Sequence, residues 1–292
     1  MISDNDRVIL TEVTHPYQSF RPFYILNLYA PASNGAARKT FFNSVLRSLT
    51  NLSALVDLTR TIVMGDFNYS YSRSNLLSQT SSKWLSFLDE HFVNALSIND
   101  IHNIPTFYRN SAISSTIDYI FVSNNMRSMT TDADLQKINS EWTDHSLLSI
   151  ACTVGYSSTG PGMWRANPML MKIPGYHHHL QNTVSLALNK HLPAESDQDK
   201  WDRIKISIKS ATKRFAYVNS KQKSDKLKEL QRSRNKFLRS RPDLETRLDR
   251  LPKLDLAIAQ LQKTKTDILA LKAGIRWQEK GETSVKFLKS MY

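Results

Sequence analysis

The sequence predicts an α/β domain followed by a long α-helical region. Residues 1–154 alternate between short strand-like segments and two amphipathic helical segments. From residue 176 onward the strand patterns stop and long helical patterns take over. A turn-rich stretch, Gly155 to Gly162, separates the two parts. Strands mixed with helices are typical of layered α/β domains, so this class is expected for the first part.

The strands are expected where short runs of β-branched and aromatic residues lie between turn residues. The first two runs, RVILTEV and FYILNLY, are separated by a polar loop that contains Pro16 and Pro22, and they are interpreted as a strand pair. The expected strands are residues 7–13, 23–29, 61–64, 106–108, 116–123 and 146–154.

Two helices are expected inside the α/β domain. In residues 37–58, Phe41, Val45 and Leu49 recur at helical spacing, and residues 80–96 place Trp84 and Leu88 on one face. Three more helices are expected in the second part, and Pro242 and Pro252 are expected to interrupt the pattern. These helices are residues 176–191, 197–241 and 253–280.

The last two helices suggest a hairpin. Ser196 or Asp197 is a suitable N-cap for the first of them. The Leu/Ile stripe of residues 254–271 extends over only about two and a half heptads, which favours intramolecular packing over a dimer zipper.

The net charge of +13 is unevenly distributed. Residues 1–155 contain 11 basic and 13 acidic residues, a net charge of −2, whereas residues 156–292 contain 28 basic and 13 acidic residues, a net charge of +15. The excess makes a polyanion the first expected partner: DNA, or RNA through residues 197–280. A solvated helix face is the alternative interpretation. The aromatic residues among these basic ones suit either base stacking or packing inside the hairpin.

The location of the chain is expected to be intracellular, and nuclear if the chain is expressed. The single cysteine, Cys152, cannot form an intrachain disulfide. Apolar runs stay below the length of about 18 residues that a membrane span needs, so no membrane contact is predicted. The eight glycines do not form a dinucleotide-binding loop, and no small-molecule cofactor is expected.

Two segments place polar residues at the ends of predicted strands. Asn27-Leu28-Tyr29-Ala30-Pro31 ends a strand at Tyr29, so its phenol could project into a cleft. Gly65-Asp66-Phe67-Asn68 ends another strand, and period-2 alternation places Asp66 and Asn68 on one face with Phe67 packed behind them. A carboxylate beside a carboxamide suits activation of a water and fixation of a substrate oxygen. An ordinary Asp-x-Asn turn remains an alternative.

Two further segments add acids and a histidine. Asp118 lies in the strand Ser115-Thr-Ile-Asp-Tyr-Ile-Phe-Val122, and Thr143-Asp144-His145-Ser146 begins another strand. A carboxylate such as Asp144 can hold a hard cation such as Mg²⁺, and an imidazole oriented by a second carboxylate can donate to a phosphoryl oxygen. The structural alternatives are a strand-edge acid and a loop end.

The ordered set NLYAP, GDFN, SxxDYIFVS and TDHS resembles the endonuclease/exonuclease/phosphatase superfamily, which includes deoxyribonuclease I-like and apurinic/apyrimidinic nucleases. It looks most like the endonuclease region of a non-LTR (LINE-type) retrotransposon polyprotein. The resemblance implies a four-layer α/β sandwich of two packed mixed sheets flanked by helices. The domains implied are an endonuclease-like domain at 1–154, a linker at 155–175, and a basic helical connector at 176–292.

The resemblance also implies roles for individual residues in phosphodiester hydrolysis. Asp66 resembles the general base and Asn68 the residue that positions the phosphate. Asp144 resembles a ligand of Mg²⁺ or Mn²⁺. His145 resembles the group that stabilises the phosphoryl charge, with Asp118 as its orienting carboxylate. The last two correspondences are Tyr29, similar to the family's active-site tyrosine, and Thr106, at a position of substrate hydrogen bonding.

One part of the family pattern is missing before Tyr29. Family members carry an N-terminal strand with an active-site Asn and then a Gln-Glu-Thr-like motif whose Glu is the main metal ligand. Glu12 is the only Glu before Tyr29, and it lacks those flanks. The domain is therefore expected to be truncated at its N-terminus, with an incomplete metal site and impaired catalysis. The alternative function is an inactive remnant whose basic helical half binds nucleic acid non-specifically.

A second, shorter resemblance lies near the C-terminus. Residues 275–288, IRWQEKGETSVKFL, look like the segment that leads into the reverse transcriptase of these elements. No polymerase Tyr-x-Asp-Asp motif follows, so the chain is expected to end before the polymerase. A phosphatase or lipid phosphodiesterase of the same superfamily is a third interpretation, and the retrotransposon-like tail disfavours it.

Overall fold

The computed structural model describes residues 6–52, 54–109, 113–155, 164, 166–190 and 195–280. The chain forms two compact units. The first contains Met1–Ser158 together with Gln231–Ile258, and the second contains Thr159–Leu230 together with Ala259–Tyr292.

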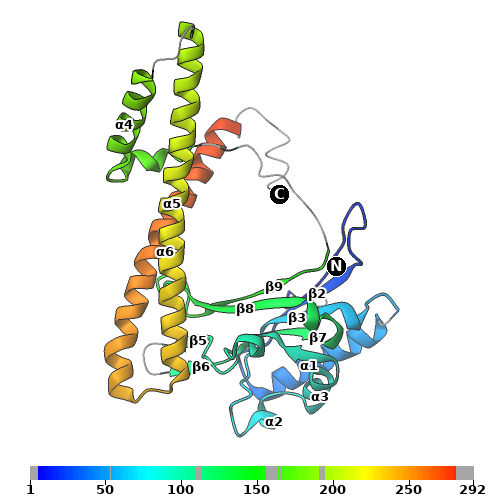
Figure 1. Ribbon diagram of the computed structural model, residues 1–292. Coiled ribbons are helices and arrows are strands. Elements are labelled where there is room, and N and C mark those ends of the chain that lie inside the picture. Colours follow the sequence, from blue (N-terminus) through cyan, green and yellow to red (C-terminus); the bar gives the residue numbers. More distant parts are fainter. Residues whose placement is uncertain are drawn as a thin grey trace. The chain divides into compact units, whose positions relative to one another are not determined.

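A five-stranded mixed sheet forms the centre of the first unit, in the order β1-β2-β3-β7-β4 (Figure 1). Strands β2 and β3 are parallel, and the other neighbours are antiparallel. The parallel pair brings the carboxyl ends of β2 and β3 to the same edge, where polar side chains can meet. The strands are β1 (Val8–Val13), β2 (Phe23–Tyr29), β3 (Thr61–Asp66), β7 (Asp118–Ser123) and β4 (Phe92–Asn94).

Helices α1 (Gly35–Asn51) and α3 (Ser82–His91) cover one face of this sheet, with the short α2 (Leu76–Gln79) beside them (Figure 1). The core between the helices and the sheet is aromatic. Phe42, Phe67 and Trp84 are fully buried, and the rings of Phe42 and Trp84 stack with their centroids 4.8 Å apart. Phe67 therefore packs behind the GDFN segment, as predicted. This packing fixes the strand end from which Asp66 and Asn68 project.

An antiparallel ribbon of β8 (Thr130–Lys137) and β9 (Ser146–Cys152) packs on the opposite face. Apolar side chains of β3 and β7 meet Leu148 and Ile150 of β9 there. A second ribbon pairs β5 (Phe107–Arg109) with β6 (Ile113–Ser115). More than one sheet, helices on the sheet face and long helices further along the chain confirm the predicted α/β class. The 3₁₀ helices are η1 (Leu58–Arg60), η2 (Ala95–Asn99), η3 (Asn124–Met129) and η4 (Pro168–Lys172).

The helix predicted at 80–96 is too long. It ends at His91, because Phe92 turns to an extended conformation and residues 92–94 pair with β7 as β4. Residue 92 continues the apolar spacing of Trp84 and Leu88, so local periodicity alone could not mark this boundary. Strand β8 was not predicted, although its Ala133, Leu135 and Lys137 alternate onto one buried face.

The C-terminal helices are α5 (Asp197–Arg239) and α6 (Leu244–Lys280). The prediction that Pro252 interrupts the pattern and that the helix begins at 253 is wrong, since Pro252 lies inside α6. The helix begins earlier because Asp243 accepts hydrogen bonds from the main-chain N–H and the hydroxyl of Thr246, at 2.9 and 2.7 Å. Leu248 and Pro252 are both exposed, so water can bond the carbonyl group that proline leaves without a partner.

The second unit contains α4 (Tyr176–Asn189), most of α5 and the end of α6. Tyr176 is buried and its hydroxyl lies 3.0 Å from that of Thr212. Ser196 caps α5, as expected, by accepting from the N–H of Asp199 at 3.2 Å. None of the helices in the described ranges is long and apolar enough to cross a membrane. Most of the predicted turn-rich stretch and residues 281–288 of the C-terminal motif lie outside the described residues.

Candidate active site

The end of β3 places Asp66 between two neighbouring strands. In the sheet register, Asp66 lies opposite Asp118 of β7 on one side and Tyr29 of β2 on the other. Gly65 precedes it with φ +132°, and a Cβ atom there would overlap the main-chain oxygen of Leu28. Only glycine allows β3 to approach β2 so closely in this conformation. The glycine of the GDFN segment therefore sets the position of the aspartate.

Asn68 holds the carboxylate of Asp66 from the turn that follows the strand. Its main-chain N–H donates to Oδ1 of Asp66 at 2.9 Å, and its Nδ2 donates to Oδ2 at 3.1 Å. The same Nδ2 donates to the carbonyl of Ala30 at 2.8 Å. Asn68 has φ +52°, a left-handed conformation that asparagine tolerates well. Both amide hydrogens of Asn68 are thus used within the protein, and its Oδ1 is the side-chain atom left to meet a substrate or a water.

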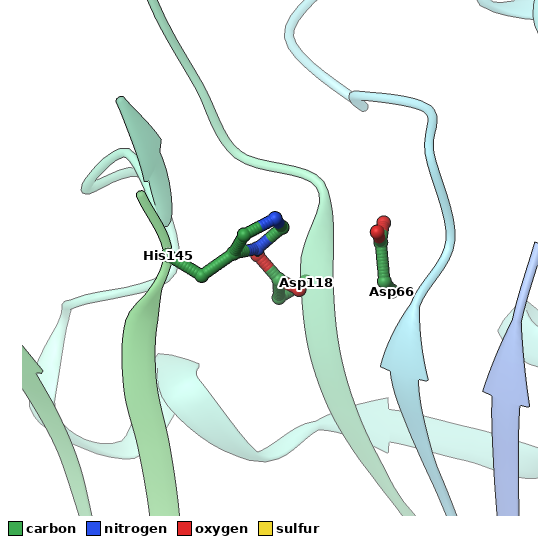
Figure 2. Close-up of side chains that lie close together, drawn as sticks. All are labelled: Asp66, Asp118 and His145. Carbon is green, nitrogen blue, oxygen red and sulfur yellow. The ribbon is translucent and has the colours of Figure 1, made fainter. Parts of the chain in front are cut away.

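Asp118 and His145 form the second half of the site (Figure 2). Nδ1 of His145 lies 2.9 Å from Oδ2 of Asp118, and the imidazole is about one third exposed at 32%. Thr106 fixes Asp118 from behind. Its side chain is fully buried, and its hydroxyl accepts the N–H groups of Ile117 and Asp118, each at 3.1 Å. Thr106 therefore faces the protein interior, where it fixes the main chain that carries the carboxylate of Asp118.

The acidic residues of the site oppose one another electrostatically. Burial, and then the nearby charge of Asp118, raise the pKa of Asp66 from 3.8 to about 6, although hydrogen bonds from Asn68 act in the opposite direction. The hydrogen bond with Asp118 raises the pKa of His145 above its ordinary value of 6.5. The raised pKa of His145 favours its protonated form, and a protonated imidazole beside an ionised carboxylate is the pair that general acid–base chemistry needs.

Three side chains could hold a metal ion. Asp66, Asp118 and His145 each offer one ligand atom, and these atoms lie within 4.8 Å of one another (Figure 2). A divalent cation would offset the repulsion from Asp118 that contributes to the raised pKa of Asp66. A hard cation needs only one or two carboxylates when it keeps its waters, so the donor set fits such an ion.

Two predicted site residues lie at the margin of this group. Asp144 has a side chain that is 58% exposed, and its Oδ1 is 3.9 Å from Nε2 of His145. Tyr29 is 52% exposed, and the guanidinium of Arg7 lies 4.9 Å from the centre of its ring. The main chain of Tyr29 pairs with that of Asp66 in the sheet. Within the described residues, no hydrogen bond or ring contact joins the side chain of Tyr29 to Asp66, Asp118 or His145.

Sequence reasoning missed the surroundings of β5. Phe107 forms an isolated bridge with His145, and their rings lie 5.1 Å apart. Lys137, at the end of β8, lies 4.6 Å from the ring centre of Tyr108 and is almost completely buried. A lysine that ends an alternating strand was a signal in the sequence, but β8 itself had not been recognised.

Residues 23–148 match the family described as endonuclease-reverse transcriptase. The seven predicted site residues all lie inside this segment. The matched segment lies within the α/β domain, which therefore resembles the endonuclease/exonuclease/phosphatase superfamily over residues 23–148. The NLYAP and TDHS segments that suggested the family both lie inside the matched residues. A search of curated proteins finds no match.

Several solved structures resemble the chain at low sequence identity. They include an apurinic/apyrimidinic endonuclease from Archaeoglobus fulgidus (17% identity, TM-score 0.40, 52% of this chain and 66% of that chain). A 3′ phosphatase, NExo, from Neisseria bound to a product DNA hairpin covers similar shares (16%, 0.38, 51% and 66%). The third is the endonuclease domain of TRAS1, a telomere-specific non-LTR retrotransposon (14%, 0.36, 50% and 63%). This chain spans less than two thirds of the length of each.

Proposed function

We propose that the α/β domain hydrolyses phosphodiester bonds in DNA by attack of an activated water. The observation that supports this proposal is that a carboxylate and an imidazole lie together at one sheet edge, each held by a neighbour. Asn68 holds Asp66, and Asp118 holds His145. The match of residues 23–148 to the endonuclease-reverse transcriptase family agrees with it. A nuclear location stays a prediction.

The chemistry assigns one task to each group. Asp66 is ionised above about pH 6 and accepts a proton from the attacking water. Asn68 keeps that carboxylate in place, and its free Oδ1 accepts the water's second hydrogen, which aims the oxygen lone pair at phosphorus. Protonated His145 donates to a phosphoryl oxygen as negative charge develops there, while Asp118 holds the ring and stabilises its proton.

Mg²⁺ or Mn²⁺ is the proposed cofactor. Asp66 and Asp118 offer carboxylate oxygens within 4.8 Å of one another, and Asp144, at the margin of the site, is the further carboxylate expected to hold it, together with waters. When bound, the ion would supply charge stabilisation to the phosphate. Asp144 is exposed enough to reach an ion at the margin of the site.

The test is nicking of supercoiled plasmid with Mg²⁺ by the intact chain and by Asp66→Asn and His145→Gln variants. Loss of either group is expected to lower the rate by about 10²–10⁴-fold. His91→Gln is a matched control, because His91 is a partly buried histidine near a carboxylate, as His145 is, and lies outside the site. No nicking by the intact chain, or equal nicking by all variants, would contradict the proposal.

A second candidate function is nucleic-acid binding by α5, and a charge pattern favours it. Residues 203–224 contain seven basic residues and no acidic residue. In the described part of the chain, Lys209, Arg214 and Lys223 have no ion-pair partner, whereas Lys221 pairs with Asp225. Tyr217 is 66% exposed on the same stretch and could stack on a base. A row of cations without acids attracts a phosphate backbone independently of sequence.

A salt series tests this second function. For the full chain and a fluorescent oligonucleotide, the logarithm of the binding constant is expected to fall linearly with the logarithm of the salt concentration. The double variant Lys209→Gln with Arg214→Gln is expected to reduce the slope of this line by about 2. Lys39→Gln with Lys83→Gln is the control, since it removes the same charge from the α/β domain. A response that does not depend on salt would exclude the function.

A further inference from the structure

The end of α5 binds the outer edge of β8 with side-chain amides. Gln231 accepts the N–H of Lys137 and donates to its carbonyl, both at 2.9 Å. One helical turn later, Asn235 donates to the carbonyl of Leu135 at 2.8 Å. Both amide side chains are buried. They satisfy main-chain groups that another strand would otherwise pair with, so residues 231–239 complete the sheet edge in the way a strand would.

A buried arginine lies between these two amides. Arg234 is completely inaccessible to solvent, and its Nε donates to Oδ1 of Asp255 on α6 at 2.6 Å. Its guanidinium lies 5.0 Å from the centre of the Tyr108 ring on β5. A buried cation is costly unless specific contacts compensate it. Here the compensation comes from one carboxylate and one aromatic face, and it connects both helices of the hairpin to β5.

A second arginine connects the hairpin to the neighbouring strand. Nη2 of Arg247 on α6 donates to the hydroxyl of Ser114 on β6 at 3.3 Å. Ser114 is the register partner of Tyr108 in the β5–β6 ribbon. The helical hairpin therefore contacts both strands of a ribbon that is too short to be stable alone.

The ribbon in turn positions the catalytic residues. The N–H of Tyr108 donates to the carbonyl of Asp144 at 2.9 Å, and the carbonyl of Thr106 accepts the N–H of Ser146 at 2.6 Å. These two bonds enclose His145, and the hydroxyl of Thr106 holds the main chain of Asp118. A shift of β5 would therefore move the imidazole and its carboxylate partner together.

We propose that Arg234 is a positioning residue of the active site, acting through Tyr108 and β5. By this inference the hairpin 231–258 is part of the catalytic domain and not merely a connector toward the following region. Arg234 does not touch the reacting atoms. It fixes the strand that holds Asp144, His145 and Asp118 in register, and the kinetic part of this inference rests on the proposed phosphodiesterase function.

The test compares Arg234→Met with Arg234→Lys in the full chain. Methionine removes the charge but fills the space, whereas lysine can still reach Asp255 and the ring. For Arg234→Met, NMR is expected to show hydrogen exchange at the amides of Tyr108 and Ser146 faster by about tenfold or more, with β1 and β2 unchanged. The kcat for nicking is expected to fall about tenfold or more at unchanged KM, and lysine is expected to restore part of it.

Two further variants keep the test decisive. Arg239→Met removes another α5 contact, to the carbonyl of Asn99 at 3.2 Å, that does not involve β5, so exchange at Tyr108 and Ser146 is expected to stay unchanged. If Arg234→Met does not fold, Arg234→Met with Asp255→Leu removes both buried charges together. Unchanged exchange in a folded Arg234 variant, or changed exchange with unchanged kcat, would overturn the inference. Exchange needs no activity, so an inactive chain would contradict only the proposed function.

Discussion

Asp66 is expected to destabilise the folded protein at neutral pH, and Asp66→Asn is expected to relieve this effect. The unfolded chain releases the proton of Asp66 near the ordinary pKa of 3.8, whereas the folded protein keeps it until about pH 6. Between pH 3.8 and about pH 6, Asp66 is protonated in the folded protein and ionised in the unfolded chain. The contribution of the protonated Asp66 to the stability of the fold is therefore complete below pH 3.8 and is lost as the pH rises through about 6.

The magnitude follows from the two pKa values. They differ by about two pKa units, and each unit corresponds to about 1.4 kcal/mol, so ionisation of Asp66 costs the fold up to about 3 kcal/mol. Asparagine keeps an oxygen that accepts from the main-chain N–H of Asn68, but it loses the second bond, from Nδ2, worth about 1 kcal/mol. A net gain in unfolding free energy of about 2 kcal/mol is expected near pH 8 without divalent cations.

Urea denaturation across about pH 4 to pH 8, with a chelator present, measures this effect. The difference in unfolding free energy between Asp66→Asn and the unchanged protein is expected to grow by about 2.4 kcal/mol over that range, because a small part of the effect is already present at about pH 4. Asp89→Asn, at an exposed aspartate of α3, is the control and is expected to show a small, constant difference. A constant difference for Asp66→Asn would refute the reasoning, because it would show that the folded protein does not hold the proton of Asp66 more tightly than the unfolded chain.

Three more predictions concern the same site. Gly65→Ala is expected to lower the unfolding free energy by about 3 kcal/mol, since alanine would combine a positive φ with an overlap against β2; unchanged stability in urea would contradict this. Thr106→Val is expected to cost about 2 kcal/mol and to slow nicking, because the N–H of Asp118 loses its acceptor, whereas Thr106→Ser should retain both properties. The nicking rate is expected to rise through about pH 6 as Asp66 ionises and to fall at higher pH as His145, whose pKa is raised, loses its proton. A rate that is flat between about pH 5 and pH 7 would argue against Asp66 as the base.

The sequence was most informative where local rules decide the structure. Alternation at the end of a strand correctly placed Phe67 in the core and Asp66 at the sheet edge, because period 2 is a property of the backbone. The α/β class followed from the same patterns. The pairing of Asp118 with His145 is different, since 27 residues separate them and only the family resemblance suggested it.

The sequence-based predictions are wrong where contacts between distant parts of the chain override local conformational preference. Phe92 continues a helical apolar pattern, yet pairing with β7 makes it the start of a strand. Pro252 is tolerated in a helix because its turn faces solvent. The role of Gln231 had no local signal, because its partner, Lys137, lies 94 residues away and the amide replaces a strand.

That separation has a consequence for how the protein forms during synthesis. The edge of β8 emerges with Lys137, but Gln231 and Asn235 follow 94 and 100 residues after their partners. At a synthesis rate of about 5–20 residues per second, the edge of β8 stays unpaired for about 5–20 s before these residues are made. An uncovered strand edge is a template for pairing with other chains. The nascent protein therefore passes through an aggregation-prone interval, and a gene fragment that stops at the turn-rich stretch after β9 would leave it in that state.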